Sequence, residues 1–165
     1  MSKFVIYLNV QPFLKQWLEY HYGSPVRFPD GSAQNRAIRR VTTRLQPGMM
    51  PRLQQPGDIA IVIPDSKEKD PAIYNHLTEK GESAMRNALN DLFMDSFIPT
   101  IRQDREAGIR LQDSIYMYCE RHHISIDYAN ALRMREFRER ECHTRHGVTL
   151  QYRERLKNKK KHLNF

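Results

Sequence analysis

Residues 85–101 read MRNALNDLFMDSFIPTI and contain the strongest helical periodicity of the chain. Their apolar side chains recur three or four residues apart, which is the spacing of one face of an α-helix. The stripe consists of Met85, Ala88, Leu89, Leu92, Phe93, Phe97, Ile98 and Ile101. Either Thr78 or Ser83 can cap the start of this helix, and Gly108 closes the segment. We expect Pro99 to kink the helix or to end its hydrogen bonding, because proline has no backbone N–H.

Two β-strands are predicted upstream of this helix, at residues 3–10 (KFVIYLNV) and 58–64 (DIAIVIP). Both stretches are rich in β-branched and aromatic residues and carry apolar side chains for both faces, so we expect strands covered on both sides. Between them, apolar spacing predicts helices at 12–22 and 33–45, the second capped by Ser32. The intervening segment 46–57 contains three prolines and two glycines and is predicted to be a loop.

The chain becomes more helical after residue 110. A helix is expected over 111–122, then a tight connection at 123–125, then a second helix that Asp127 favours at its start and that runs to about Cys142. The fold class is therefore α+β, with a small N-terminal sheet and packed helices followed by a helical C-terminal region. We divide the chain into an α/β region at 1–75, a helical region at 78–147 and a basic tail at 148–165.

Positive charge is concentrated toward one end of the chain. The net charge is +8, and residues 101–165 carry 15 Lys/Arg against 9 Asp/Glu. Such a concentration is expected for contact with a polyanion. The alternative is a basic tail that only aids solubility.

The segment 115–134 fits a twenty-residue helix-turn-helix frame in part. The positions that should be apolar or small receive Tyr118, Cys119, Ile124, Ala129 and Leu132. Two positions fit poorly: His122 stands where an apolar residue is usual, and His123 where a glycine is common in the turn. An ordinary helical hairpin that completes the core is the other interpretation.

We predict that the basic residues bind nucleic acid, specifically duplex DNA. Arginine forms bidentate hydrogen bonds with guanine edges and phosphates, and asparagine can pair with adenine. The candidate contacts are Asn130, Arg133, Arg135, Arg138, Arg140, Arg145, Arg153 and Arg155, with Arg36, Arg40 and Arg44 as an extension if their helix lies on the same side. Phosphate anchoring is favoured over sequence readout for most arginines, because Glu136, Glu139 and Glu141 can also pair with them. The expected role is a regulator or accessory factor, for example of a mobile element or phage.

Two other classes of function stay open. A structural or protein-interaction protein could present Phe93, Met94 or Phe97 to a partner, although a core role explains that stripe better. A metal-dependent nuclease would need converging carboxylates such as Asp58, Asp65 and Asp70, with His76 nearby. Since no glycine-rich phosphate loop or catalytic motif is found, we predict no enzyme activity and no cofactor.

Cysteine and histidine spacing suggests zinc only superficially. Cys119 and His122 form one pair and Cys142 and His146 another, with His123 and His143 beside them. If the second helix is continuous, the two cysteines lie about 24 Å apart, so no metal site is predicted.

The remaining expectations concern location and assembly. The first residues lack a full apolar signal core, and no run approaches the ~18 apolar residues of a membrane span. We therefore expect a cytoplasmic protein with reduced cysteines and without membrane contact. A homodimer is compatible with DNA binding at two half-sites.

Overall fold

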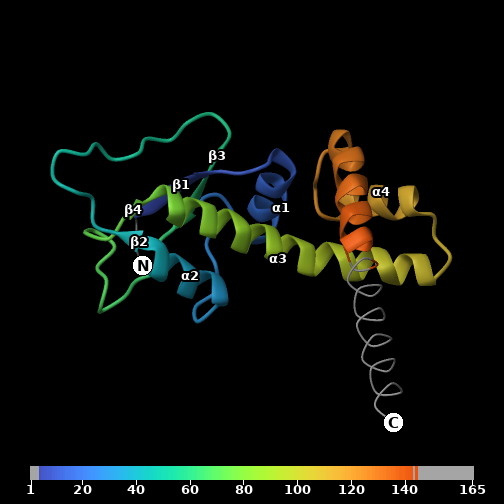
Figure 1. The fold of residues 1–165 in the computed structure, drawn as a ribbon, viewed down its shortest axis with the longest axis horizontal. Coiled ribbons are helices and arrows are strands. Elements are labelled where there is room, and N and C mark those ends of the chain that lie inside the picture. The colour runs from blue at the N-terminus through green and yellow to red at the C-terminus, as the bar shows by residue number, and fades with distance from the viewer. Residues whose placement is uncertain (1–3, 143, 145–165) are drawn as a thin grey trace, which may run out of the picture. The chain divides into compact units, whose positions relative to one another are not determined.

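The structure, a computed structural model, describes residues 4–142 and 144 and has an α+β architecture (Figure 1). In chain order the elements are β1 (Val5–Asn9), α1 (Pro12–Tyr22), α2 (Ala33–Val41), β2 (Thr42–Thr43), β3 (Asp58–Val62), β4 (His76–Leu77), α3 (Glu79–Glu106), α4 (Leu111–Arg121), a 3-10 turn (Ile126–Tyr128) and a helix at 129–142. The predicted class, a small N-terminal sheet with packed helices, is confirmed.

β1 and β3 form an antiparallel pair whose register runs from Val5 opposite Val62 to Asn9 opposite Asp58. Backbone hydrogen bonds also join Val26 to the other edge of β3. β3 is covered on both faces, as predicted for its uninterrupted apolar run. In β1 only one face is fully buried, because Val5 and Tyr7 stay partly exposed. The expectation that β1 is covered on both sides is therefore wrong for that second face.

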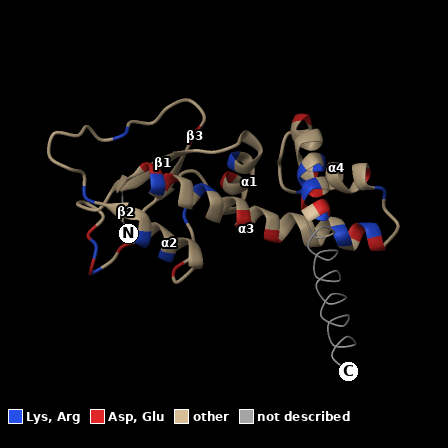
Figure 2. Ribbon diagram, in the orientation of Figure 1, with Lys and Arg blue, Asp and Glu red and all other residues tan. Residues whose placement is uncertain are grey.

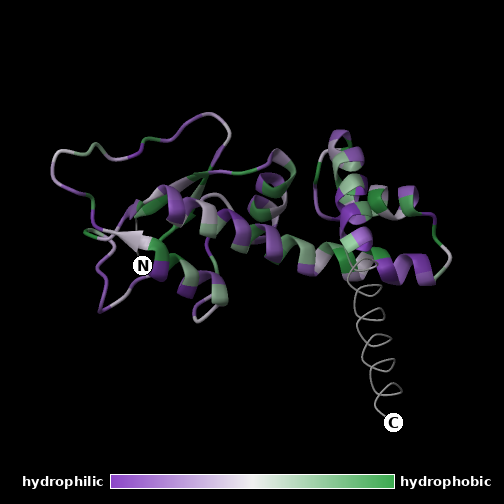
Figure 3. Ribbon diagram, viewed as in Figure 1, coloured by the Kyte–Doolittle hydropathy of each residue, from purple (hydrophilic) through white to green (hydrophobic). Residues whose placement is uncertain are grey.

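The 28-residue helix α3 is the packing partner common to the helices α1, α2 and α4 of its unit. Thr78 caps its start by accepting a hydrogen bond from the backbone N–H of Gly81 at 3.1 Å. The side chains of Met85, Leu89, Phe93, Phe97 and Ile101 are buried, and α3 packs against α1, α2 and α4. In Figure 3, green apolar positions alternate with purple polar ones along the helix, as the periodicity predicts.

Pro99 does not end α3, which continues to Glu106. An interior proline removes a backbone hydrogen bond and costs about 3 kcal/mol. The cost is met here by packing, because Phe97 and Ile101 on either side of the proline are both buried. The expected termination near Pro99 is thus wrong.

An aromatic cluster joins three helices into the core of this unit. Phe93 of α3 contacts Phe13 and Trp17 of α1, with ring centroids 5.3 and 5.6 Å apart. Phe97 meets the ring of Tyr118 of α4 edge-on, with centroids 5.1 Å apart. Because Phe93 and Phe97 are fully buried, they belong to the core and are not available to a partner protein.

α2 is shorter than the predicted helix at 33–45. Ser32 caps its start as expected, by accepting from the backbone N–H of Asn35 at 3.1 Å. The helix ends at Val41 because Thr42–Thr43 turns into β2 and pairs with β4. Lys69 Nζ secures this end by donating to the carbonyl oxygens of Arg39 and Thr42, at 2.7 and 3.0 Å.

The chain divides into two compact units, Met1–Ile126 and Asp127–Phe165. All strands and the helices α1 to α4 belong to the first unit. Of the second unit the structure describes residues 127–142 and 144, which form the 3-10 turn and helix 129–142. Within residues 4–142 and 144, no helix has both the length and the apolar character that a membrane span requires.

Candidate nucleic-acid interface

The division between the two units coincides with a division of charge. Residues 127–165 carry 11 Lys/Arg against 5 Asp/Glu, a net of +6. Residues 1–126 carry 16 against 14, a net of only +2. Most of the net charge of the protein therefore lies in the smaller unit.

Helix 129–142 has one buried face. Ala129, Leu132 and Glu136 are 3%, 0% and 7% exposed. Their spacing of three and four residues places them on one side of the helix. Glu136 thus lies on the buried side, one helical turn from both Arg133 and Arg140.

The arginines of this helix stand on two sides of the exposed surface. At about 100° of rotation per residue, Arg133 and Arg140 lie at nearly the same angle, with Asn130 beside them. Arg138 and Arg135 lie on the opposite flank. Asn130, Arg133, Arg138 and Arg140 are all exposed, whereas Arg135 is half-buried. Figure 2 shows the resulting alternation of blue and red bands along this helix.

The exposed arginines of helix 129–142 share the helix with acidic side chains, because residues 127–142 carry four Lys/Arg and four Asp/Glu. Among the residues that the structure describes, no ion pair joins Arg133, Arg138 or Arg140 to an acidic side chain. Burial, and secondly the positive charge of Arg138, lower the pKa of Arg135. The net charge of +6 in residues 127–165 therefore comes from residues 143–165, which carry seven Lys/Arg against one Asp/Glu.

Two apolar side chains are exposed on the same helix. Met134 is 46% and Phe137 41% exposed. The guanidinium of Arg140 lies over the ring of Phe137, 5.6 Å from its centroid. Sequence analysis did not single out these two residues, although their spacing opposite Leu132 could have placed them on the outer face.

The three predicted contacts around α2 belong to the first unit. Arg36 and Arg40 are exposed on α2, where Arg36 donates to the carbonyl oxygen of Gly31 at 2.8 Å. Arg44 follows β2 and covers the ring of Tyr74 at 5.0 Å, so it does not continue the face of α2 as predicted. A surface shared with helix 129–142 stays a prediction. Arg145, Arg153 and Arg155 lie outside the described residues, as does the tail at 148–165.

Burial at the apolar or small positions of the helix-turn-helix frame is compatible with both interpretations, a helix-turn-helix and an ordinary helical hairpin. Tyr118, Cys119, Ile124, Ala129 and Leu132 are all buried. Because the frame crosses from the first unit into the second, its interhelical geometry stays a prediction.

The two histidines that fit this frame poorly each have a structural explanation. His123 adopts the left-handed conformation, with φ of 54°, which is the conformation a glycine would supply. Its ring stacks on Tyr20 with centroids 4.3 Å apart. His122 forms a 2.9 Å hydrogen bond between its Nδ1 and Nε2 of His21, and its ring packs on Tyr118. Sequence analysis missed this pair, whose members are 101 residues apart.

The electrostatics of the histidine pair favour neutral rings. Burial, then the proximity of His21 and Arg121, lower the pKa of His122 to about 4. Burial also lowers the pKa of His21. Over residues 4–142 and 144, no three His, Cys, Asp or Glu side chains are close enough to hold a metal ion. Cys119 is buried and Cys142 exposed, while His143 and His146 are not described.

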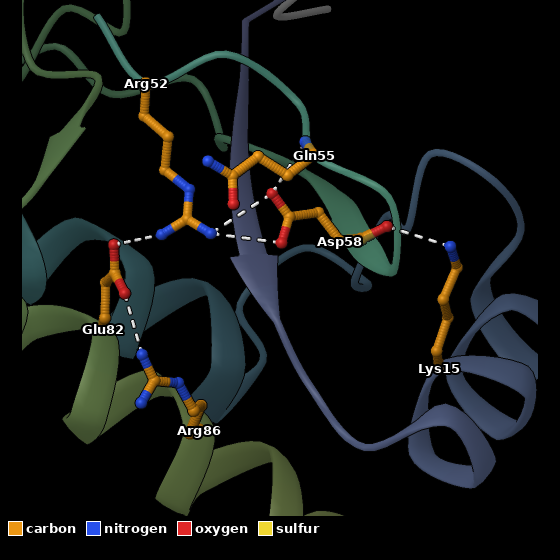
Figure 4. A network of polar contacts seen from close by, with 6 residues as sticks. All are labelled: Lys15, Arg52, Gln55, Asp58, Glu82 and Arg86. Atoms are coloured by element: carbon orange, nitrogen blue, oxygen red, sulfur yellow. Dashed lines mark hydrogen bonds and ion pairs between the residues drawn. The ribbon is translucent and has the colours of Figure 1, made fainter.

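The acidic residues considered for a nuclease have other partners. Asp58 is 1% exposed and accepts hydrogen bonds from Nη2 of Arg52, at 3.1 and 3.2 Å, and from the backbone N–H of Gln55 (Figure 4). Asp70 accepts from the backbone N–H of Ala72. The carboxylate of Asp58 thus belongs to a structural network.

A pocket of about 730 Å³ opens between α1, α2 and the end of β3. Its lining includes the guanidinium groups of Arg27 and Arg39 together with the carboxylates of Asp30 and Asp65. Because charges of both signs line the pocket in equal number, it does not select an anionic or a cationic ligand.

Comparisons with protein-family models, with curated proteins and with solved structures give no match to this chain. The second unit combines a net charge of +6 in its sequence with the exposed side chains of Arg133, Arg138 and Arg140.

Proposed function

We propose that this protein binds duplex DNA through its second unit, as a regulator or accessory factor in transactions such as replication, recombination or the movement of a mobile element. The observation that carries the proposal is the net charge of +6 in residues 127–165, combined with the exposed side chains of Arg133, Arg138 and Arg140 on helix 129–142. A cytoplasmic location fits this role.

The physical basis is the release of counterions from the DNA backbone. Each phosphate that a guanidinium neutralises releases condensed cations and adds about 0.9 to the steepness of the log–log dependence of affinity on salt. Arginine suits this contact because its planar fork donates two parallel hydrogen bonds to phosphate. Removing one such contact should reduce the slope by about 0.9.

Fluorescence anisotropy with random-sequence duplex DNA tests the proposal on the full chain. Affinity would be measured from about 50 to about 200 mM salt for the parent and for Arg133→Ala/Arg138→Ala. The variant should bind more weakly and with a shallower slope. Arg102→Ala is the matched control, because Arg102 is exposed on α3 in the first unit. Absence of salt-sensitive binding by the parent, or equal slopes for the parent and the double variant, would overturn the proposal.

A second candidate function, protein interaction, is favoured by a different surface. The loop between β2 and β3 exposes Met49, Met50 and Leu53, which are 49%, 87% and 78% exposed. Exposed apolar side chains gathered in one loop are a feature of interaction sites. Light scattering of the parent and of Met50→Ser/Leu53→Ser distinguishes this role: self-association lost in the variant would support it, and an unchanged monomer would exclude self-association through the loop.

A further inference from the structure

We infer that one face of helix 129–142 reads base edges in the DNA major groove, an inference that rests on the proposed function. This reading face consists of Asn130, Arg133, Phe137 and Arg140. The four residues are spaced by three, four and three positions, so they form a single stripe along the helix. All four are exposed, and the stripe borders the buried side formed by Ala129, Leu132 and Glu136.

The dimensions of the stripe fit a groove. From Asn130 to Arg140 the helix rises about 15 Å, at ~1.5 Å per residue. This length corresponds to about four base pairs, at ~3.4 Å each. The major groove is about 12 Å wide and admits one α-helix.

The side-chain chemistry of the stripe is that of direct readout. Asparagine makes a bidentate pair with adenine, and arginine makes one with guanine O6 and N7. An aromatic ring such as that of Phe137 contacts the methyl group of thymine. Asparagine can also donate to phosphate, but phenylalanine has no hydrogen-bonding group, so phosphate contacts alone do not explain an exposed Phe137.

The other flank of the helix supplies the complementary function. Arg138 is exposed there and Arg135 half-buried, about a third to a half turn away from the stripe. Phosphate contacts fix the register of a protein on DNA but carry no sequence information. Arg138 therefore positions the helix, whereas Asn130 and Arg133 specify the sequence.

Charge complementarity decides for DNA over a protein as the occupant of this face. Residues 127–142 carry four Lys/Arg and four Asp/Glu, whereas residues 143–165, which follow the face in the chain, carry seven Lys/Arg against one Asp/Glu and so account for the net charge of +6. Arg133, Arg138 and Arg140 would have to be desolvated at an interface with a second, equally positive copy of the chain, which is unfavourable.

Selection from a random duplex library with the full-length protein tests the inference. The parent should enrich a common motif of about four base pairs. Asn130→Ala should bind that motif roughly ten- to a hundredfold more weakly and lose preference at one position, with unchanged affinity for unrelated duplexes. Arg138→Ala is the matched comparison, because it should weaken binding to all sequences alike and reduce the salt slope.

The outcomes separate this inference from the proposed function. Salt-sensitive binding without enrichment of any motif would overturn readout and leave DNA binding intact. Asn130→Ala weakening all sequences equally would also overturn it. No binding by the parent would remove both proposals. If Phe137→Ala converts a dimer into a monomer and leaves the enriched motif unchanged, the face is an interface between two copies and the inference is wrong.

Discussion

Replacing Asp58 with asparagine should destabilise the first unit strongly, because Asp58 is the centre of a buried ionic network (Figure 4). Its side chain is completely buried, whereas that of its partner Arg52 keeps 31% exposure. Arg52 also pairs with Glu82, which in turn accepts from Arg86 at 2.8 Å. The substitution preserves shape but removes the charge that opposes the Arg52 guanidinium, and it points an amide donor at another donor.

The magnitude follows from the burial of the pair. Removing one partner of a buried ion pair costs about 3–5 kcal/mol. Because Arg52 is partly hydrated and retains Glu82, we expect about 3 kcal/mol for Asp58→Asn, the lower end of that range. For a chain of this length, that loss lowers the Tm by roughly 6–12 °C.

Urea denaturation followed by Trp17 fluorescence measures the effect, since Trp17 is the only tryptophan and is buried in the first unit. Asp95→Asn is the matched control, because Asp95 is exposed on α3. The double variant Asp58→Asn/Arg52→Ala should lose little more free energy of unfolding than either single variant if the two groups act as a pair. A loss for Asp58→Asn that equals the loss for Asp95→Asn would refute the reasoning.

Three further predictions concern other parts of the molecule. Burial, aided by His21, lowers the pKa of His122 from 6.5 to about 4, so folding favours the neutral ring; this contribution to stability is complete above pH 6.5 and is lost as the pH falls toward 4. The free energy of unfolding should be measured by urea titration at about pH 7.5 and about pH 5. After allowance for solvent screening, His122→Gln should lose about 1 kcal/mol less of it than the parent does over this range. Equal losses in the two proteins would contradict this. Thr78→Ala removes the side-chain cap of α3 and should cost about 1 kcal/mol by thermal denaturation, whereas an unchanged Tm would show that the cap is dispensable. In the native protein Cys142 should react quickly with a thiol reagent and Cys119 slowly, because Cys119 is buried and burial raises the pKa of its thiol; two equally fast thiols would be inconsistent with the fold.

Local patterns predicted the elements whose formation depends on their own residues. The stripe through Met85, Phe93 and Ile101 identified α3, and Ser32 and Thr78 cap helices as their hydroxyl chemistry predicts. The stripe through Ile101 and the closing Gly108 indicated that α3 continues past Pro99, but whether the proline ends the helix depended on tertiary packing. The strand pair β2–β4 was also missed, since two-residue strands leave almost no periodicity, although the β-branched run Val41–Thr43 is a weak signal.

The candidate site was predictable in composition but not in arrangement. The sequence indicated a basic helix, and spacing alone could have separated the Arg133 side from the Arg138 side. It could not show how deeply Glu136 is buried, because burial depends on contacts made by the folded chain. The hydrogen bond between His21 and His122 depends on contact between distant segments, for which no local pattern exists.

The two ion pairs of Arg52, with Asp58 and Glu82, have a consequence for proteolysis of the loop that contains Arg52. Trypsin cleaves after arginine, but it must first draw the guanidinium into its own acidic pocket, and here that group is held by Asp58 and Glu82. The peptide bond between Arg52 and Leu53 therefore becomes cleavable only in molecules that have released both carboxylates, so the rate of nicking at this bond reports how often the loop detaches from the sheet and from α3.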